Sequence, residues 1–231
     1  QKSIIYLCVA VVLILSLIAI SLIQGISIDP VIFAESYAYF LVVIAGLYFM
    51  YLFLLAGLSA SEKKNLVLLF FLFIGAAAFW SGFDQSGGSL TIFARDFTNL
   101  SILGYSFPIS WMNLANPIFV VIFAPIFAGI WTNLAIRNLD PSLPMKFSIG
   151  LLLMALSFVL MLYAVDLAMM TQKIGIQWLL LTYLLHTWGE LALSPIGLSA
   201  FSRYAPKKYA GQMFGLWFMA SAIGGVLAGL L

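Results

Sequence analysis

The chain has 231 residues, of which 64% are hydrophobic and only 8% are charged. A soluble domain is about half apolar and about a quarter charged, so this composition excludes an ordinary soluble fold and favours a helical membrane protein. Ten Lys and Arg residues against eight Asp and Glu residues leave a net charge of +2, which argues against a nucleic-acid partner. The single cysteine, Cys8, cannot form an internal disulfide bond.

Seven apolar segments are long enough to cross a bilayer, which takes roughly 20 residues of helix. In chain order, the predicted spans are residues 3–23, 31–58, 66–94, 111–136, 147–165, 175–201 and 210–231. The links between them are mostly short. The sequence therefore predicts an all-α integral membrane bundle that contacts lipid and has no separate soluble domain.

The positive charges set the expected orientation. If Lys2 lies inside, seven crossings place eight of the ten Lys and Arg residues on the inner side and only Arg95 and Lys173 on the outer side. By the positive-inside rule, the chain then begins in the cytoplasm and ends on the far side of the membrane.

The third span contains a polar interruption around Asp84. Ser81 and Gly82 precede it, and the run from Asp84 to Ser89 contains only polar residues and glycines. Lipid cannot satisfy the backbone of such an irregular stretch, so we expect it to line a cavity or to pack against protein. A charge near the bilayer centre costs at least about 2.5–3.5 kcal/mol, which makes Asp84 a candidate functional residue. The alternative is a kinked helix that only packs on its neighbours.

Glu190, in the middle of the sixth span, is the second acid at depth. His186 lies one helical turn before it and Ser194 one turn after it, so this face of the helix is polar. With one histidine and no usable cysteine, neither a metal site nor another cofactor is expected. A buried carboxyl that changes its cationic partner during a conformational cycle can bind and release a proton, whereas the alternative is a carboxyl that only holds the bundle together.

Neither acid has an evident cationic partner, because no Lys or Arg lies at depth in this chain. If the two acids ionise, their partners lie on a ligand or on helices outside the chain. The last span carries two pairs of glycines four residues apart, Gly211 with Gly215 and Gly225 with Gly229, which predict close packing against a neighbouring helix.

Three motifs resemble, in order, those of the proton-dependent oligopeptide transporters of the major facilitator superfamily. The run FWSGFDQSGGS (79–89) is similar to the family's seventh-helix motif, and Asn116-Pro117-Ile118-Phe119 with Ala124-Pro125 is similar to its eighth helix. The run GELALSPIG (189–197) is similar to its tenth helix. The combination and the order of these motifs make the resemblance specific.

The resemblance extends over the whole chain. It identifies residues 1–64 as the helix pair that bacterial members insert between their two six-helix halves, and residues 65–231 as helices seven to eleven of the C-terminal bundle. Helix twelve and the N-terminal half would then be missing. The resemblance implies a location in the bacterial inner membrane, with the C-terminal end on the periplasmic side.

The resemblance also implies roles for individual residues. Glu190 would bind the amino terminus of a peptide and take part in proton coupling, and Asp84 would pair with an arginine of the first helix. Asn116 would contact the peptide amino group, and Asp96 is similar to an outer-gate acid that pairs with a basic residue of the N-terminal half. Further positions in the substrate pocket would be Trp80, Phe83, Ser194 and Trp217.

We therefore expect the C-terminal half of a proton-coupled symporter that imports di- and tripeptides by alternating access. An acidic half facing a basic half would fix the direction of a zwitterionic peptide, and proton binding would weaken one contact at a time. Two alternatives stay open, namely a transporter of the same fold for another solute such as nitrate or a glycoside, and a membrane subunit of a proton-translocating complex. An enzyme is least expected, because no nucleophile–base pair or phosphate-binding loop is present.

Overall fold

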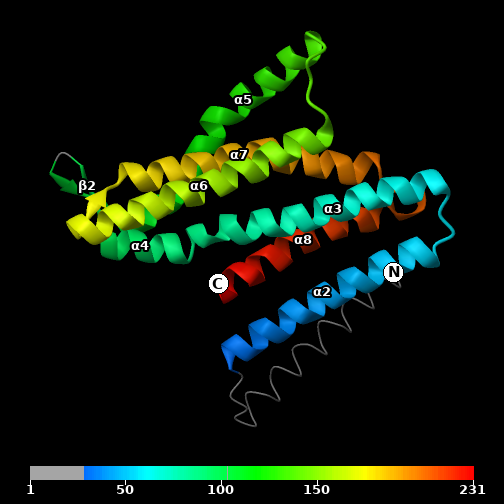
Figure 1. The fold of residues 1–231 in the computed structure, drawn as a ribbon, viewed down its shortest axis with the longest axis horizontal. Coiled ribbons are helices and arrows are strands. Elements are labelled where there is room, and N and C mark those ends of the chain that lie inside the picture. The colour runs from blue at the N-terminus through cyan, green and yellow to red at the C-terminus, as the bar shows by residue number, and fades with distance from the viewer. Residues whose placement is uncertain (1–28, 103) are drawn as a thin grey trace, which may run out of the picture.

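A computed structural model of the chain describes residues 29–102 and 104–231. The predicted span 3–23 lies outside the described residues. Each later predicted span corresponds to a long helix (Figure 1). These helices are α2 (Pro30–Leu54), α3 (Ala60–Phe83), α5 (Ala115–Ile136), α6 (Leu143–Thr171), α7 (Gln177–Arg203) and α8 (Ala210–Leu230). The predicted all-α class is confirmed.

Five helical segments of the described chain are long and apolar enough to cross a membrane. α7 is not among them, although its 27 residues are sufficient in length. It carries polar side chains along its middle, including His186, Thr187 and Glu190, which lower its hydropathy. The predicted count of seven spans is therefore not confirmed.

Four helices, α3, α6, α7 and α8, run side by side and form the body of the bundle, with α2 packed against α8 (Figure 1). Aromatic side chains fill the space between α2 and α3, where the rings of Phe49 and Phe73 meet edge to face at 5.4 Å. Leu52 and Leu66 are fully buried in the same core. The division at residues 64 and 65 stays a prediction, and α2 shares one core with α3 and α8.

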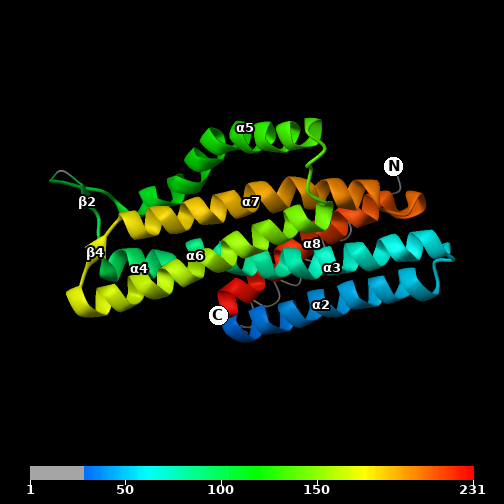
Figure 2. The same ribbon diagram turned by 45° about the horizontal axis from the view of Figure 1, so that its top comes forward.

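The helix α5 leaves the bundle along its length. Its first half lies near α7, and the ring of Phe123 meets that of Trp188 at 5.4 Å. Pro125 lies inside the helix, where it removes one backbone hydrogen bond and its ring clashes with the preceding turn. Figure 2 shows α5 bent and lying above α7. A proline kink is the physical reason that α5 diverges.

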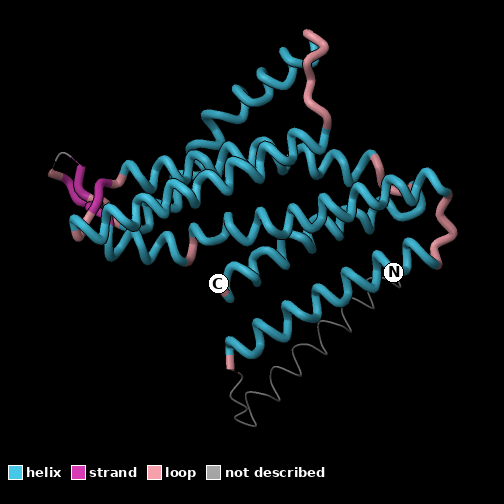
Figure 3. Tube along the Cα trace, in the orientation of Figure 1, coloured by secondary structure: helices cyan, strands magenta, loops and turns pink. Residues whose placement is uncertain are grey.

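Short strands join the segments at one end of the bundle (Figure 3). β1 (Thr98–Asn99) pairs in parallel with β4 (Ile174–Gly175), which ties the chain after α4 (Ser89–Phe97) to the link between α6 and α7. β2 (Ser101–Ile102) pairs antiparallel with β3 (Tyr105–Ser106). The sequence did not predict these two-residue strands.

Glycines set the closest helix crossings. A Cβ atom on Gly150 of α6 would lie 2.6 Å from the Cβ atom of Leu193 and 2.8 Å from the carbonyl oxygen of Gly189, both on α7. A Cβ atom on Gly224 of α8 would lie 2.6 Å from the Cβ atom of Trp80 on α3. Only glycine allows the two backbones to approach this closely.

The predicted glycine pairs on α8 are only partly confirmed. A Cβ atom on Gly225 would lie 2.9 Å from a carboxylate oxygen of Asp84, so Gly225 does meet a neighbour. Around Gly211, Gly215 and Gly229, in contrast, no atom of the described chain lies within 4 Å of that position. The described residues supply no close neighbour at these three glycines, and packing there against a helix outside them stays a prediction.

The crossing of α6 and α7 predicts a position-specific loss of stability. Gly150→Ala should lower the free energy of unfolding by about 1–3 kcal/mol, because the new methyl group meets backbone that cannot move aside. The matched control is Gly46→Ala on α2, where a Cβ meets nothing within 4 Å and helix propensity gains up to about 1 kcal/mol. Thermal unfolding in detergent measures the stability of both purified variants. Equal melting temperatures for the two variants would contradict the tight crossing.

Candidate functional site

The predicted interruption of the third span is a true helix break. α3 ends at Phe83, a short 3₁₀ helix η1 (Asp84–Ser86) follows, and α4 begins at Ser89. At the break, side chains replace helical backbone hydrogen bonds. The carbonyl oxygen of Ser86 accepts hydrogen bonds from Thr91 Oγ1 (2.8 Å) and Tyr183 Oη (3.4 Å). A helix can be broken at this depth because such groups replace the lost backbone partners.

Gln85 anchors the break to the end of α8. Its side chain is buried, and Nε2 donates to the carbonyl oxygen of Ala228 at 3.0 Å. Its Oε1 accepts a hydrogen bond from Ser89 Oγ at 2.8 Å. Gln85 therefore ties the chain just after Asp84 to α8 and to the first residue of α4.

A cavity of about 520 Å³ opens beside the break. Ser81, Gly82 and Gln85 line it from α3 and η1, and Met154 and Phe158 line it from α6. The expectation that the irregular stretch lines a cavity is confirmed. Neither of the two acids at depth lines this cavity, so it does not bring the predicted site residues together.

Asp84 lies at the start of η1 with its side chain exposed on the described bundle. One carboxylate oxygen faces Gly225 of α8. Among residues 29–102 and 104–231, the carboxylate makes no ion pair. A carboxylate in this position is accessible to a cation from outside the described chain.

Glu190 is held by a hydrogen-bond network between α5 and α7. Asn116 Nδ2, in the first turn of α5, donates to Glu190 Oε2 at 3.0 Å and to Thr187 Oγ1 at 3.1 Å. Thr187 in turn donates to the carbonyl oxygen of Tyr183 at 2.8 Å. The structure thus brings together two predicted site residues that are 74 positions apart.

Thr187 is a member of this network that the sequence analysis missed. It is fully buried and lies three residues before Glu190, on the same face of α7. That spacing was the available signal. Ser194, one turn after Glu190, is half-buried and stays a predicted pocket residue.

The predicted aromatic residues lie in two separate places. Trp80 and Phe83 are half-buried at the end of α3, with ring centroids 5.1 Å apart. Trp217 is buried between α7 and α8, where its ring fills the space left by Gly197 and meets Phe201 at 5.5 Å. The structure does not bring Trp217 to the network of Glu190, and its role as a pocket wall stays a prediction.

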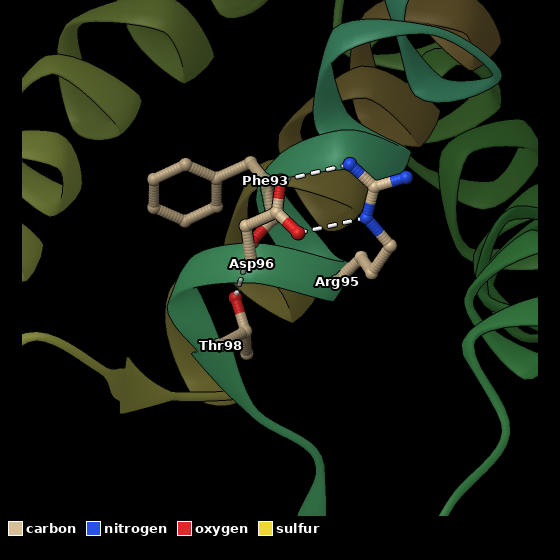
Figure 4. Close-up of polar contacts among 4 residues, drawn as sticks. All are labelled: Phe93, Arg95, Asp96 and Thr98. Atoms are coloured by element: carbon tan, nitrogen blue, oxygen red, sulfur yellow. Dashed lines mark hydrogen bonds and ion pairs between the residues drawn. The ribbon is translucent and has the colours of Figure 1, made fainter.

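Asp96 is paired with the residue next to it (Figure 4). Its two carboxylate oxygens accept hydrogen bonds from Arg95 Nε (2.7 Å) and Arg95 Nη2 (2.9 Å), while Thr98 Oγ1 donates to the carbonyl oxygen of Phe93 (3.3 Å). Both charged side chains are exposed, and an exposed ion pair contributes only about 0–1 kcal/mol. Asp96 could therefore leave Arg95 and pair with another cation at little cost in free energy. The gate role of Asp96 stays a prediction.

Comparison with known proteins establishes the family. The family model described as PTR2, POT family, matches residues 6–231. The chain belongs to the POT family. The peptide transporter YePEPT of Yersinia enterocolitica subsp. palearctica serotype O:3 (strain YE-P4) is 39% identical over 224 residues, which is 96% of this chain and 43% of that protein. The di-/tripeptide transporter of Lactococcus lactis subsp. cremoris is 32% identical over 78% of this chain and 37% of its own length.

Solved structures of this family have the same fold as the chain. A mutant of the peptide transporter POT in complex with alafosfalin superposes with a TM-score of 0.81 and 29% identity, over 96% of this chain and 45% of that one. A POT family transporter in complex with 5-aminolevulinic acid superposes with a TM-score of 0.84 and 26% identity, over 99% of this chain and 47% of that one. The chain spans somewhat less than half the length of the relatives that it matches.

The network between α5 and α7 predicts the effect of removing its donor. Asn116→Ala should lower stability by about 0.6–1.7 kcal/mol, which spans the average and the largest value from double-mutant cycles on hydrogen bonds between membrane helices. The control is Asn113→Ala, an exposed asparagine just before α5, for which a change within about 0.5 kcal/mol is expected. Thermal unfolding in detergent distinguishes the two variants. A loss as large for Asn113→Ala would contradict the assigned role of Asn116.

Proposed function

We propose that this chain is the C-terminal half of a proton-coupled symporter that imports di- and tripeptides by alternating access. The observation that carries the proposal is a carboxylate, Glu190, held by Asn116 in a half that has no Lys or Arg at depth. The family, the relatives named as peptide and di-/tripeptide transporters, and the neighbour in complex with alafosfalin support it.

The network leaves two acceptors for a peptide amino group. Asn116 uses its Nδ2 for both Thr187 and Glu190, so its carbonyl oxygen Oδ1 remains available. Glu190 accepts the Asn116 bond on Oε2 and keeps Oε1 for another donor. An ammonium group with three N–H donors would bind between these two oxygens, at the junction of α5 and α7.

Proton coupling follows from the charge of the acids. An ionised Glu190 or Asp84 attracts a substrate amine or a cation of the opposite half, and a protonated acid does not. Proton binding therefore weakens one contact at a time and shifts the population between conformations. The proton is the coupling ion in this scheme, and it needs no other cofactor.

The proposal includes a partner and an orientation. The rest of the same protein would supply the opposite half with its basic side chains, and the bacterial inner membrane would surround both. The start of α3 and the link between α7 and α8 lie at one end of the bundle, and the end of α4 with the short strands lies at the other (Figure 1). The first end carries Lys63, Lys64, Arg203, Lys207 and Lys208, and the second carries Arg95 and Lys173. By the positive-inside rule the first end would be cytoplasmic.

A second candidate substrate class is other small solutes that carry both an amine and a carboxylate. The neighbour in complex with 5-aminolevulinic acid favours it. Such a solute presents the same ammonium group to Glu190 and Asn116. Competition between labelled dialanine and a panel of peptides, amino acids, nitrate and glycosides would rank the classes.

The proton role of Glu190 can be tested by transport into liposomes. With an inward proton gradient, full-length wild-type protein should accumulate labelled dialanine. Glu190→Gln keeps the size of the side chain and one acceptor oxygen but cannot exchange a proton, so accumulation should fall at least about tenfold. The matched control is Glu35→Gln, an exposed acid on α2, which should accumulate peptide as the wild type does.

Two results would count against this account. Normal accumulation by Glu190→Gln would remove Glu190 from proton coupling. Wild-type protein that accumulates a solute other than a peptide would reassign the substrate while leaving the family unchanged.

A further inference from the structure

His186 is a buried polar side chain that the proposed mechanism does not yet use. It is 1% exposed on the described chain alone, so its burial does not depend on any further segment or partner. Both ring nitrogens, Nδ1 and Nε2, lack a hydrogen-bond partner among the described residues. An unpaired buried polar group is costly, and native proteins retain few of them.

The surroundings of the ring are aromatic. The ring centroid lies 5.9 Å from that of Phe83 on α3, 5.8 Å from Phe158 on α6 and 6.4 Å from Tyr183 on α7. Of these neighbours only Tyr183 is titratable, and its hydroxyl group is directed to the carbonyl oxygen of Ser86. None of these contacts supplies a charge to stabilise an imidazolium ion. The neutral ring then offers one N–H donor and one acceptor nitrogen.

Packing alone does not account for a histidine in this cage. Phenylalanine or leucine would fill a similar volume and leave no polar atom unpaired, which makes an apolar replacement neutral or stabilising. A histidine is useful at this position if its N–H finds an acceptor in another arrangement of the same residues.

The nearest candidate acceptor along the helix is Glu190. His186 and Glu190 are four residues apart on α7, a spacing at which two side chains can meet on one face of a helix. In the present arrangement Glu190 takes its hydrogen bond from Asn116, which belongs to a different helix, α5. Motion of α5, or capture of the Asn116 side chain by a substrate, would remove that donor. His186 would keep its spacing of one helical turn from Glu190, because both residues belong to α7.

We propose that His186 is a positioning residue that donates an N–H hydrogen bond to Glu190 when Asn116 is no longer its donor. The proposal rests on the proposed function of Glu190 in proton coupling and names the step that His186 serves. A hydrogen bond to the charged form of a carboxyl favours that form, so donation by His186 keeps Glu190 able to ionise, with its proton passing to water, after the bond to Asn116 is lost. No group other than this proton is transferred, and the imidazole stays neutral throughout.

The test uses two variants of the full-length protein in liposomes. His186→Phe fills the aromatic cage without a donor, and His186→Gln keeps an N–H donor without an ionisable ring. Proton-driven accumulation of labelled dialanine should fall about tenfold for His186→Phe, because a hydrogen bond to a charged group is lost in one state of the cycle. Accumulation by His186→Gln should stay near that of wild type. Exchange of labelled for unlabelled dialanine without a gradient should persist in both, since it does not require net proton release.

A stability measurement tests the same idea without transport. In wild type, His186→Phe should leave the melting temperature unchanged or raise it. In the Asn116→Ala background the same substitution should lower it, because there His186 has become the donor to Glu190. If the ring only packs, His186→Phe should change the melting temperature by the same amount in both backgrounds, so a change of sign between them indicates the hydrogen bond to Glu190.

The possible results separate the two proposals. Wild-type protein that transports no peptide would count against the proposed function, and the stability cycle would still decide the role of His186. Normal accumulation by His186→Phe, failure of His186→Gln to restore accumulation, or additive melting temperatures in the cycle would each overturn the inference.

Discussion

A carboxylate at the depth of a membrane needs hydrogen-bond donors or a cation, and this constraint organises the chain. Glu190 meets it with Asn116 from another helix, and Thr187 orients the same amide. Asp84 has no such donor from another helix of the described chain. It lies at a helix break, and its side chain is exposed on the described bundle. The first acid is held inside this chain, and the second is open to a partner outside it.

The rest of the bundle fixes where these two acids lie. Close glycine crossings at Gly150 and Gly224 hold α6 against α7 and α8 against α3, so the helices that carry Asp84 and Glu190 have little freedom to shift. α5, which carries Asn116, bends at Pro125 and leaves the bundle. Glu190 therefore takes its hydrogen bond from a helix other than its own, while the close crossing at Gly150 holds α7 in place.

Hydropathy predicted the helices well because their apolar runs match the thickness of a bilayer. The break near Asp84 was also predictable, since polar residues and glycines cannot continue a lipid-facing helix. The bond between Asn116 and Glu190 was not, because no local pattern relates residues 74 positions apart, and only the family resemblance placed both in one site. Thr187 was missed although its spacing from Glu190 put it on the same face.

Other expectations failed or stay open for physical reasons that a sequence pattern does not contain. The spacing of Gly211 and Gly215 is that of a close helix contact, but it does not say which face of α8 meets a neighbour, and the contact lies at Gly224 instead. Trp217 was predicted in a pocket, yet the space beside Gly197 buries its ring. Asp96 lies in the last turn of α4 and pairs with the adjacent Arg95, which no sequence pattern indicated.

We propose that the cations opposite the acids of this chain lie on another part of the same protein. An experimental structure of the full-length protein, with side chains resolved around the break in the third span, tests this claim most directly. The account predicts a Lys or Arg side chain from another part of the protein within about 4 Å of the Asp84 carboxylate, the distance of an ion pair. An Asp84 carboxylate that contacts only residues of this chain, or only lipid, would contradict it.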